Sequence, residues 1–213
     1  MATEISHDID ALVETAKRAI AALEAEGIPY LLGGGLGCWA LGGPPSSNDV
    51  DLMLRREDAE PALAALEAAG FRGERPPEQW LFKAWEEREQ ADGGEVLIDL
   101  IFEPSGLEIT DAVLARGSTV GIGGMDARVM DLDEIFVTKL MSIDEHACDY
   151  EGHLAIARAL REKLDWRRLR EETAASPFAT AFFTLADGLG ISLDAPGAGA
   201  AGASSTAADA AAR

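Results

Sequence analysis

The sequence predicts an α+β fold, in which a mixed sheet flanked by helices precedes a helical C-terminal region. Short apolar runs bounded by glycine, proline and polar residues alternate with helical patterns over residues 1–130. Helical patterns dominate residues 131–194, whereas residues 195–213 are almost entirely small or polar and can bury little. We therefore predict an α/β core, a helical region and a disordered tail over these three ranges.

Apolar residues at helical spacing, with glycine and proline at the ends, define the predicted helices. These helices cover residues 9–26, 36–41, 57–69 and 177–189, and a longer helical stretch over 131–170 has breaks near 148–152 and 165. Gly27 and Gly70 follow the first and third of them, at positions where glycine commonly ends a helix.

The predicted strands are short and apolar. They cover residues 28–32, 49–54, 80–85 and 95–102, and a hairpin over 118–130 turns near Gly123 and Gly124. Because strands and helices are interleaved in the first part of the chain, we expect the sheet to lie there.

The chain carries a formal net charge of −20 over 213 residues. Nucleic-acid binding requires a basic surface along the phosphate backbone, so this charge argues against such a partner and favours a small or cationic one. Cys38 and Cys148 form no paired framework, the start of the chain has no apolar signal core, and no run is long enough to span a bilayer. We therefore expect a cytoplasmic protein without a membrane partner.

Three aspartates lie in or beside apolar strands. Asp49 and Asp51 are two positions apart, so a strand points both carboxylates to the same face. Asp99 has three apolar neighbours on each side, where a carboxylate is costly unless a cation meets it. Carboxylates in this arrangement suit a divalent cation, most simply Mg²⁺. The alternatives are a solvated turn for Asp49 and Asp51 and a structural ion pair for Asp99.

The cluster Gly33, Gly34 and Gly35 lies between a predicted strand and a short predicted helix. Glycines at such a place let a ligand approach the backbone, and the N–H groups at a helix start attract phosphate. The alternative is an ordinary tight turn.

Residues 35–40 also fit the Gly-x-Gly-x-x-Ala fingerprint of dinucleotide-binding proteins, with Glu57 and Asp58 about 20 residues downstream. The helix that this fingerprint should open is cut by the Gly-Gly-Pro-Pro run at residues 42–45. A nicotinamide-dependent oxidoreductase is therefore the weaker alternative.

His146, Cys148, Asp149 and His153 form a second group of residue types that bind metals. Their spacing matches no standard zinc pattern, and they fall at a predicted helix break. We predict that they lie at the surface or cap helices.

The glycine turn and the three aspartates together resemble the DNA polymerase β superfamily of nucleotidyltransferases. The matching pattern runs from Leu32–Gly35 through Asp49–Asp51 to Asp99, and residues 46–48 resemble the small bacterial members. Residues 131–140 resemble the helix that opens their C-terminal bundle. The resemblance implies the nucleotidyltransferase fold, a mixed sheet flanked by helices with a C-terminal helical bundle.

The resemblance also implies an activity, the Mg²⁺-dependent transfer of a nucleoside monophosphate from a nucleoside triphosphate such as ATP to an acceptor hydroxyl, with release of pyrophosphate. It makes Asp49, Asp51 and Asp99 the catalytic and metal-binding residues, and Asp99 would also accept the proton of the acceptor hydroxyl.

Five further residues are implied to bind the nucleotide. These are Gly33, Gly34, Gly35 and Ser47 near the turn, and Lys139, which would face the triphosphate. The acceptor stays open between a small polycation such as an aminoglycoside, a protein side chain and a tRNA end, although the acidic surface suits the polycation and discourages RNA. A catalytically silent nucleotide- or partner-binding module of the toxin–antitoxin type is the further alternative.

Overall fold

A computed structural model of the chain describes residues 9–46, 49–87, 95–105 and 107–194. Seven strands form one mixed sheet in the order β3-β4-β5-β2-β1-β7-β6, which confirms the predicted α+β class. The elements in chain order are α1 (Ile9–Ala25), β1 (Leu31–Leu32), α2 (Gly34–Ala40), β2 (Val50–Met53), the 3-10 turn η1 (Arg56–Asp58), α3 (Ala59–Ala68), β3 (Arg72–Glu74), β4 (Leu81–Glu87), β5 (Glu95–Ile101), α4 (Asp111–Arg116), β6 (Ser118–Ile122), β7 (Met125–Val129), α5 (Leu132–Met141), α6 (Glu151–Leu160), α7 (Trp166–Glu172) and α8 (Pro177–Gly188).

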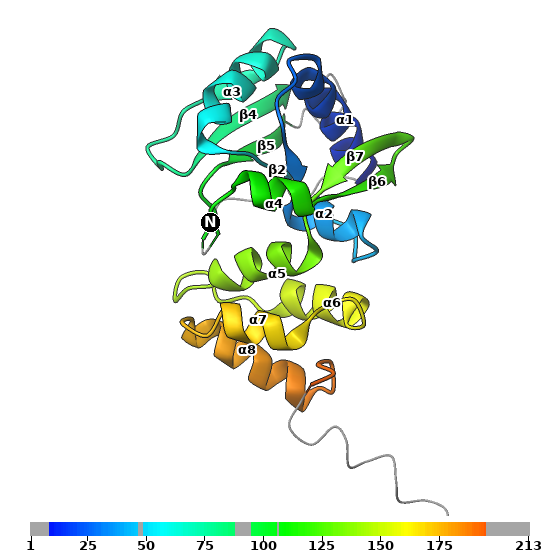
Figure 1. The fold of residues 1–213 in the computed structure, drawn as a ribbon, viewed down its shortest axis with the longest axis vertical. Helices are drawn as coiled ribbons and strands as arrows, with labels where there is room; N and C mark the ends of the chain where they lie inside the picture. Colours follow the sequence, from blue (N-terminus) through cyan, green and yellow to red (C-terminus); the bar gives the residue numbers. More distant parts are fainter. Residues whose placement is uncertain (1–8, 47–48, 88–94, 106, 195–213) are drawn as a thin grey trace, which may run out of the picture.

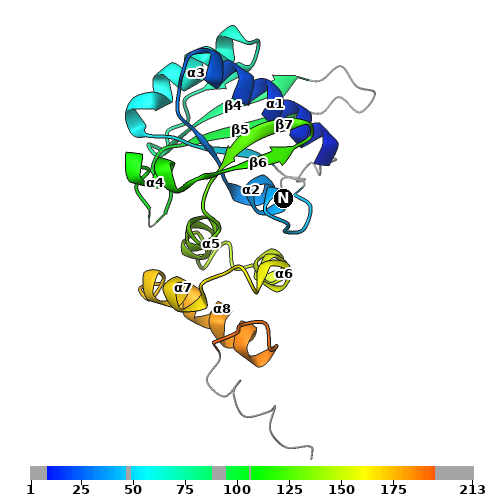
Figure 2. The ribbon, with the colours of Figure 1, turned by 45° about the vertical axis from the view of Figure 1, so that its right-hand side comes forward.

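The sheet separates two groups of helices (Figure 1). Helices α1 and α3 cover one face, whereas α5, α6, α7 and α8 stack beyond the other face, with α2 and α4 between the sheet and this bundle (Figure 2). None of the helices described here combines the length and the apolar character needed to cross a membrane. The predicted tail over residues 195–213 lies outside the described residues.

The strand pairing distinguishes the predicted nucleotidyltransferase fold from the dinucleotide-binding fold, since the glycine-rich run at residues 33–37 was compatible with both. Strand β1 pairs antiparallel with β2, while β2 pairs parallel with β5. A dinucleotide-binding fold joins its first two strands through a helix in the parallel sense. The antiparallel pairing of β1 and β2 therefore excludes that fold and the oxidoreductase alternative that rested on it.

Local sequence signals account for the starts of four helices and for the hairpin. Side chains at the residue before the helix accept an N–H from the residue three positions on in α4, α5, α7 and α8, where the capping residues are Thr110, Asp131, Asp165 and Ser176. Gly123 and Gly124 both have positive φ, 54° and 83°, as the two-residue turn between β6 and β7 requires.

Three predicted elements have different bounds in the structure, and two further elements were not predicted. The strand expected over 28–32 is paired only at β1, the short helix α2 begins at Gly34 rather than at Leu36, and the helix over 57–69 is divided into η1 and α3. Strand β3 and helix α4 were not predicted. Strand β3 is a polar edge strand and α4 has only six residues, so neither carries a clear apolar period.

Helix α2 joins the sheet to the helical bundle through Gly37. A Cβ at this position would lie 2.9 Å from the carbonyl oxygen of Leu32 and 3.1 Å from Cδ1 of Ile135. The absence of a side chain lets α2 pack closely against both β1 and α5. Within the bundle, the ring of Phe136 on α5 packs edge-on against Phe182 on α8, with ring centroids 5.6 Å apart.

Candidate metal and nucleotide site

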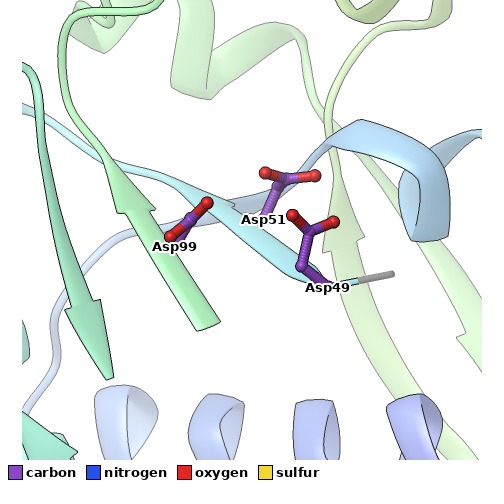
Figure 3. A group of neighbouring side chains, drawn as sticks. All are labelled: Asp49, Asp51 and Asp99. Atoms are coloured by element: carbon purple, nitrogen blue, oxygen red, sulfur yellow. The ribbon is translucent and has the colours of Figure 1, made fainter. Parts of the chain in front are cut away.

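Asp49, Asp51 and Asp99, called here the aspartate cluster, converge at the middle of the sheet (Figure 3). Asp49 directly precedes β2, Asp51 lies within β2 and Asp99 lies within β5. Each can offer one carboxylate oxygen such that these oxygens all lie within 4.8 Å of one another. The structure therefore brings together the three residues that the spacing in the sequence singled out.

The register between β2 and β5 explains the convergence. Asp51 is the direct partner of Asp99 in this parallel pair, so both side chains leave the sheet on the same side. The opposite side is covered by α1, whose Thr15 bonds to Glu86 of β4. Glu86 lies three positions from Lys83, the strand partner of Asp99, so Glu86 and Asp99 point to opposite faces of the sheet. The aspartate cluster thus lies on the face of the sheet toward the helical bundle, and not on the face that α1 covers.

Burial gives the aspartate cluster an unusual charge state. Desolvation raises the pKa of all three carboxyl groups, and the negative charge of Asp99 raises that of Asp49 further, as Asp49 does for Asp51. Three carboxylates in one place are stabilised when a cation joins them. Their oxygens are the ligands that Mg²⁺ prefers, so the residues present fit a divalent cation.

The glycine turn holds Asp51 in place. Gly34 has a positive φ of 55°, and a Cβ there would overlap the carboxylate of Asp51. The N–H of Gly33 donates to the Asp51 carbonyl at 2.9 Å, and the N–H of Gly35 bonds to the Asp51 side chain. These contacts give the turn a role that the sequence did not suggest, because they position a carboxylate beside the backbone.

A cavity of about 400 Å³ opens between the glycine turn and α6. Its lining residues are Gly35, Pro44, Pro45, Ser46, Lys139, Asp149, Glu151, Gly152, His153, Ala155 and Ile156. The positive charge of Lys139 lowers the pKa of Asp49 and Asp51, which places its ammonium group near the aspartate cluster. Within the described part of the chain, this ammonium group forms no ion pair or hydrogen bond, so it is available to an anion.

Sequence reasoning missed Lys83, which lies in β4 directly opposite Asp99. Its Nζ donates to Oδ1 of Asp99 at 2.9 Å, with the two side chains 26 % and 12 % exposed. The ion pair considered for Asp99 therefore exists alongside its place in the aspartate cluster. A signal was present, since Lys83 is the one charged residue within Leu81–Trp85, but the register of β4 and β5 was needed to connect it with Asp99.

Two other predicted groups have definite outcomes. Ser47 lies outside the described residues, but its neighbour Ser46 has its hydroxyl against Gly35 at the cavity. In the possible zinc group, His146, Cys148 and Asp149 are exposed, as predicted for surface residues, and Oδ1 of Asp149 accepts the N–H of Glu151 at 2.9 Å. The ring nitrogens of His153 lie 3.0 and 3.1 Å from two carbonyl oxygens. Where side chains are described, the aspartate cluster is the one group of three or more such residues that could share an ion.

A mixed sheet that brings an Asp-x-Asp pair on one strand and a third aspartate on the next beside a glycine turn defines a nucleotidyltransferase. The chain belongs to the family described as uncharacterised nucleotidyltransferases, whose model matches residues 4–190. The predicted resemblance and enzyme class are thereby confirmed. No curated protein matches the sequence.

Two solved structures share the fold. One is the crystal structure of ANT(2″)-Ia in complex with adenylyl-2″-tobramycin, with a TM-score of 0.55 and 18 % identity over 80 % of this chain and 98 % of that one. The other is the solution structure of the antibiotic-resistance factor ANT(2″)-Ia, with a TM-score of 0.57 and 20 % identity over 86 % of this chain and 99 % of that one. At these identities the likeness establishes the fold alone.

Proposed function

We propose that this nucleotidyltransferase uses Mg²⁺ to move a nucleoside monophosphate from a nucleoside triphosphate, such as ATP, to an acceptor hydroxyl, releasing pyrophosphate. One observation carries the proposal, which is the convergence of three partly buried carboxylates near a cavity that contains a lysine without a partner among the described residues. Such a pairing of anionic and cationic groups suits a phosphate chain that binds through a metal ion at one end and a lysine at the other.

The proposal gives each aspartate a task. Asp49 and Asp51 hold the ion, and Asp99 completes its ligand set and accepts the proton from the acceptor hydroxyl. When bound, the ion neutralises charge that develops on the phosphate oxygens during an in-line displacement. The glycine turn keeps Asp51 in position by a backbone N–H bond to its side chain, which leaves little freedom for the carboxylate to rotate.

The nucleotide is proposed to occupy the cavity beside the cluster. Lys139 would pair with the triphosphate, while the backbone of Gly33, Gly34 and Gly35 and the hydroxyl of Ser47 would bond to phosphate oxygens. A cavity of about 400 Å³ lies within the range of small-molecule sites.

A small polycation is the acceptor class that we propose. Asp149 and Glu151 line the cavity on the side of α6, and the chain carries a net charge of −20. These charges would attract a cationic acceptor and repel RNA. The complex of ANT(2″)-Ia with adenylyl-2″-tobramycin is an example, on the same fold, of a tobramycin product.

The test is a screen of the purified chain with each of four α-labelled nucleoside triphosphates against aminoglycosides, a protein lysate and tRNA. We expect labelled product and pyrophosphate with Mg²⁺, loss of both with a chelator, and loss of both in Asp49→Asn. Calorimetry with Mg-ATP runs in parallel. Nucleotide binding without turnover on any acceptor would instead favour the catalytically silent module.

A further inference from the structure

Lys83 is the one cation that forms an ion pair with a member of the aspartate cluster in the described part of the chain. Its ion-pair partner is Asp99 alone, whereas both Lys83 and Lys139 act on Asp49, and Lys139 acts on Asp51, through charge at a longer distance. The three acids are thus not equivalent. Asp99 has a counter-ion within the described part of the chain, whereas Asp49 and Asp51 have none there.

The sheet fixes the position of Lys83. Lys83 and Asp99 are direct partners in the antiparallel pair of β4 and β5, and Asp99 and Asp51 are direct partners in the parallel pair of β5 and β2. The three side chains therefore form a row across adjacent strands on one face. Because the row is set by backbone pairing, Lys83 cannot leave Asp99 without a change of side-chain rotamer.

The contact with Lys83 makes the two carboxylate oxygens of Asp99 unequal. Lys83 Nζ bonds to Oδ1 at 2.9 Å, and an ion pair with one oxygen fixes the plane of the group. A divalent cation that bound both oxygens of Asp99 would have to displace a lysine of like charge. The protein thereby favours the use of a single Asp99 oxygen at the metal side.

We propose that Lys83 is a positioning residue, which holds Oδ1 of Asp99, fixes the orientation of its carboxylate and restrains it from giving both oxygens to the metal ion. This inference rests on the proposed function of the aspartate cluster. It assigns Lys83 two opposite effects, since it supports the transfer step and weakens metal binding by its charge.

Removal of the charge therefore has opposite consequences for the two measurements. In Lys83→Met, Mn²⁺ should bind about tenfold more tightly without nucleotide, because a cation near the site is gone and Asp99 is free to bind through both oxygens. The same variant should lose roughly 10²-fold in kcat, since Asp99 is no longer held for the acceptor hydroxyl, with KM for the nucleotide within about threefold. A lysine that acted through its charge alone would change the Mn²⁺ affinity and leave kcat near the wild-type value, so the loss in kcat is the measurement that identifies a positioning role.

The experiment measures Mn²⁺ affinity by calorimetry, together with kcat and KM, in the full chain, in Lys83→Met and in three further variants. Lys83→Arg keeps the charge and should recover most of the loss in kcat, with near-normal Mn²⁺ affinity. Lys83→Gln keeps a hydrogen-bond donor without the charge, and it replaces Lys83→Met if that variant does not fold. Lys17→Met on α1 is the matched control, because among the described residues this lysine forms its ion pair with the exposed Glu14, at 2.9 Å.

The outcomes separate this inference from the proposed function. Tighter Mn²⁺ binding with a lower kcat in the Met or Gln variant, and recovery in the Arg variant, supports it. Active wild-type protein with unchanged kcat in the Met and Gln variants overturns the role of Lys83 and leaves the proposed function standing. A wild-type chain that neither binds Mn²⁺ nor releases pyrophosphate overturns both.

Discussion

Two clusters of partly buried acids lie in the described part of the chain, and their charges are balanced differently. The first is the aspartate cluster, and the second, called here the α5 cluster, consists of Asp131, Asp133 and Glu134 at the start of α5. Glu134 is 1 % exposed, and Arg116 donates to its Oε1 through Nε at 2.6 Å. Arg168 lies 3.2 Å from Asp131 and 3.7 Å from Asp133.

The comparison distinguishes a structural cluster from a functional one. The α5 cluster receives two arginines, from α4 and α7, so the chain itself supplies most of the positive charge that it needs. The aspartate cluster has a single ion-pair partner in the described residues for its three carboxyl groups. Desolvation raises the pKa of Asp133 and Glu134 as well, so the number of cationic partners, and not the pKa shift, distinguishes the two clusters. A partly buried cluster of acids with too few cationic partners in the protein is suited to bind a cation from solution.

Neutralising Asp51 should have the largest effect and should separate activity from stability. Asp51→Asn should lower transfer by roughly 10³-fold or more, because it removes a charged ligand of the proposed ion. It should also stabilise the metal-free protein by about 1–2 kcal/mol, because the buried carboxylate and its repulsion from Asp49 disappear. Activity assays and chemical denaturation with a chelator present test both parts. An active variant, or a less stable one, would contradict the assignment.

Gly34→Ala tests whether the glycine turn positions the metal site. Its Cβ would overlap the Asp51 carboxylate at a positive φ, so we expect roughly a 10²-fold loss of activity and about 1–2 kcal/mol of lost stability. Gly27→Ala is the matched control, since Gly27 has a φ of 66° and open space around its Cβ position. If both variants lose equal stability and neither loses activity, Gly34 serves only the turn.

Arg116→Met tests the internal balance of the α5 cluster. Loss of its guanidinium leaves Glu134 with a weaker set of partners in a buried place, so the free energy of unfolding should fall by about 2 kcal/mol. Addition of Mg²⁺ should not restore it, whereas Mg²⁺ should restore the stability that Lys83→Met loses in its metal-free form. Denaturation curves with and without Mg²⁺ make the comparison, and rescue of Arg116→Met by Mg²⁺ would remove the distinction between the clusters.

The pH dependence of stability gives the smallest expected effect. A carboxyl group whose pKa is higher in the folded than in the unfolded protein favours folding at low pH and loses that contribution as pH rises. For Asp51, the loss should run from the ordinary aspartate pKa near 4 up through its raised value. The metal-free wild type should therefore lose more stability over this range than Asp51→Asn does. Denaturation series at several pH values measure the difference, and parallel curves would contradict the raised pKa.

Patterns local to the chain were sufficient to predict most of the sheet and the common face of Asp49 and Asp51, whereas the meeting of Asp99 with these two followed from the family resemblance. The two-residue period placed Asp49 and Asp51 on one face, and the apolar run around Asp99 marked it as a carboxylate that needed a cation. The hairpin at Gly123 and Gly124 followed in the same way, because that turn depends on its own two residues.

Contacts between distant segments could not be predicted in this way. The pairing of Lys83 with Asp99 depends on the register of β4 and β5, and the fit of Gly34 against Asp51 depends on how α2 packs on β2. The wall of the cavity that α6 provides depends on the packing of the bundle against the core. Each of these features is tertiary, so no window of the sequence contains it.

Crystals grown with Mn²⁺ and a non-hydrolysable nucleoside triphosphate test the central claim most directly, through the anomalous diffraction of the metal. We expect a manganese peak within bonding distance of carboxylate oxygens of Asp49 and Asp51, with the phosphate chain extending toward Lys139. Nucleotide bound in the crystal with no manganese at these aspartates would contradict it.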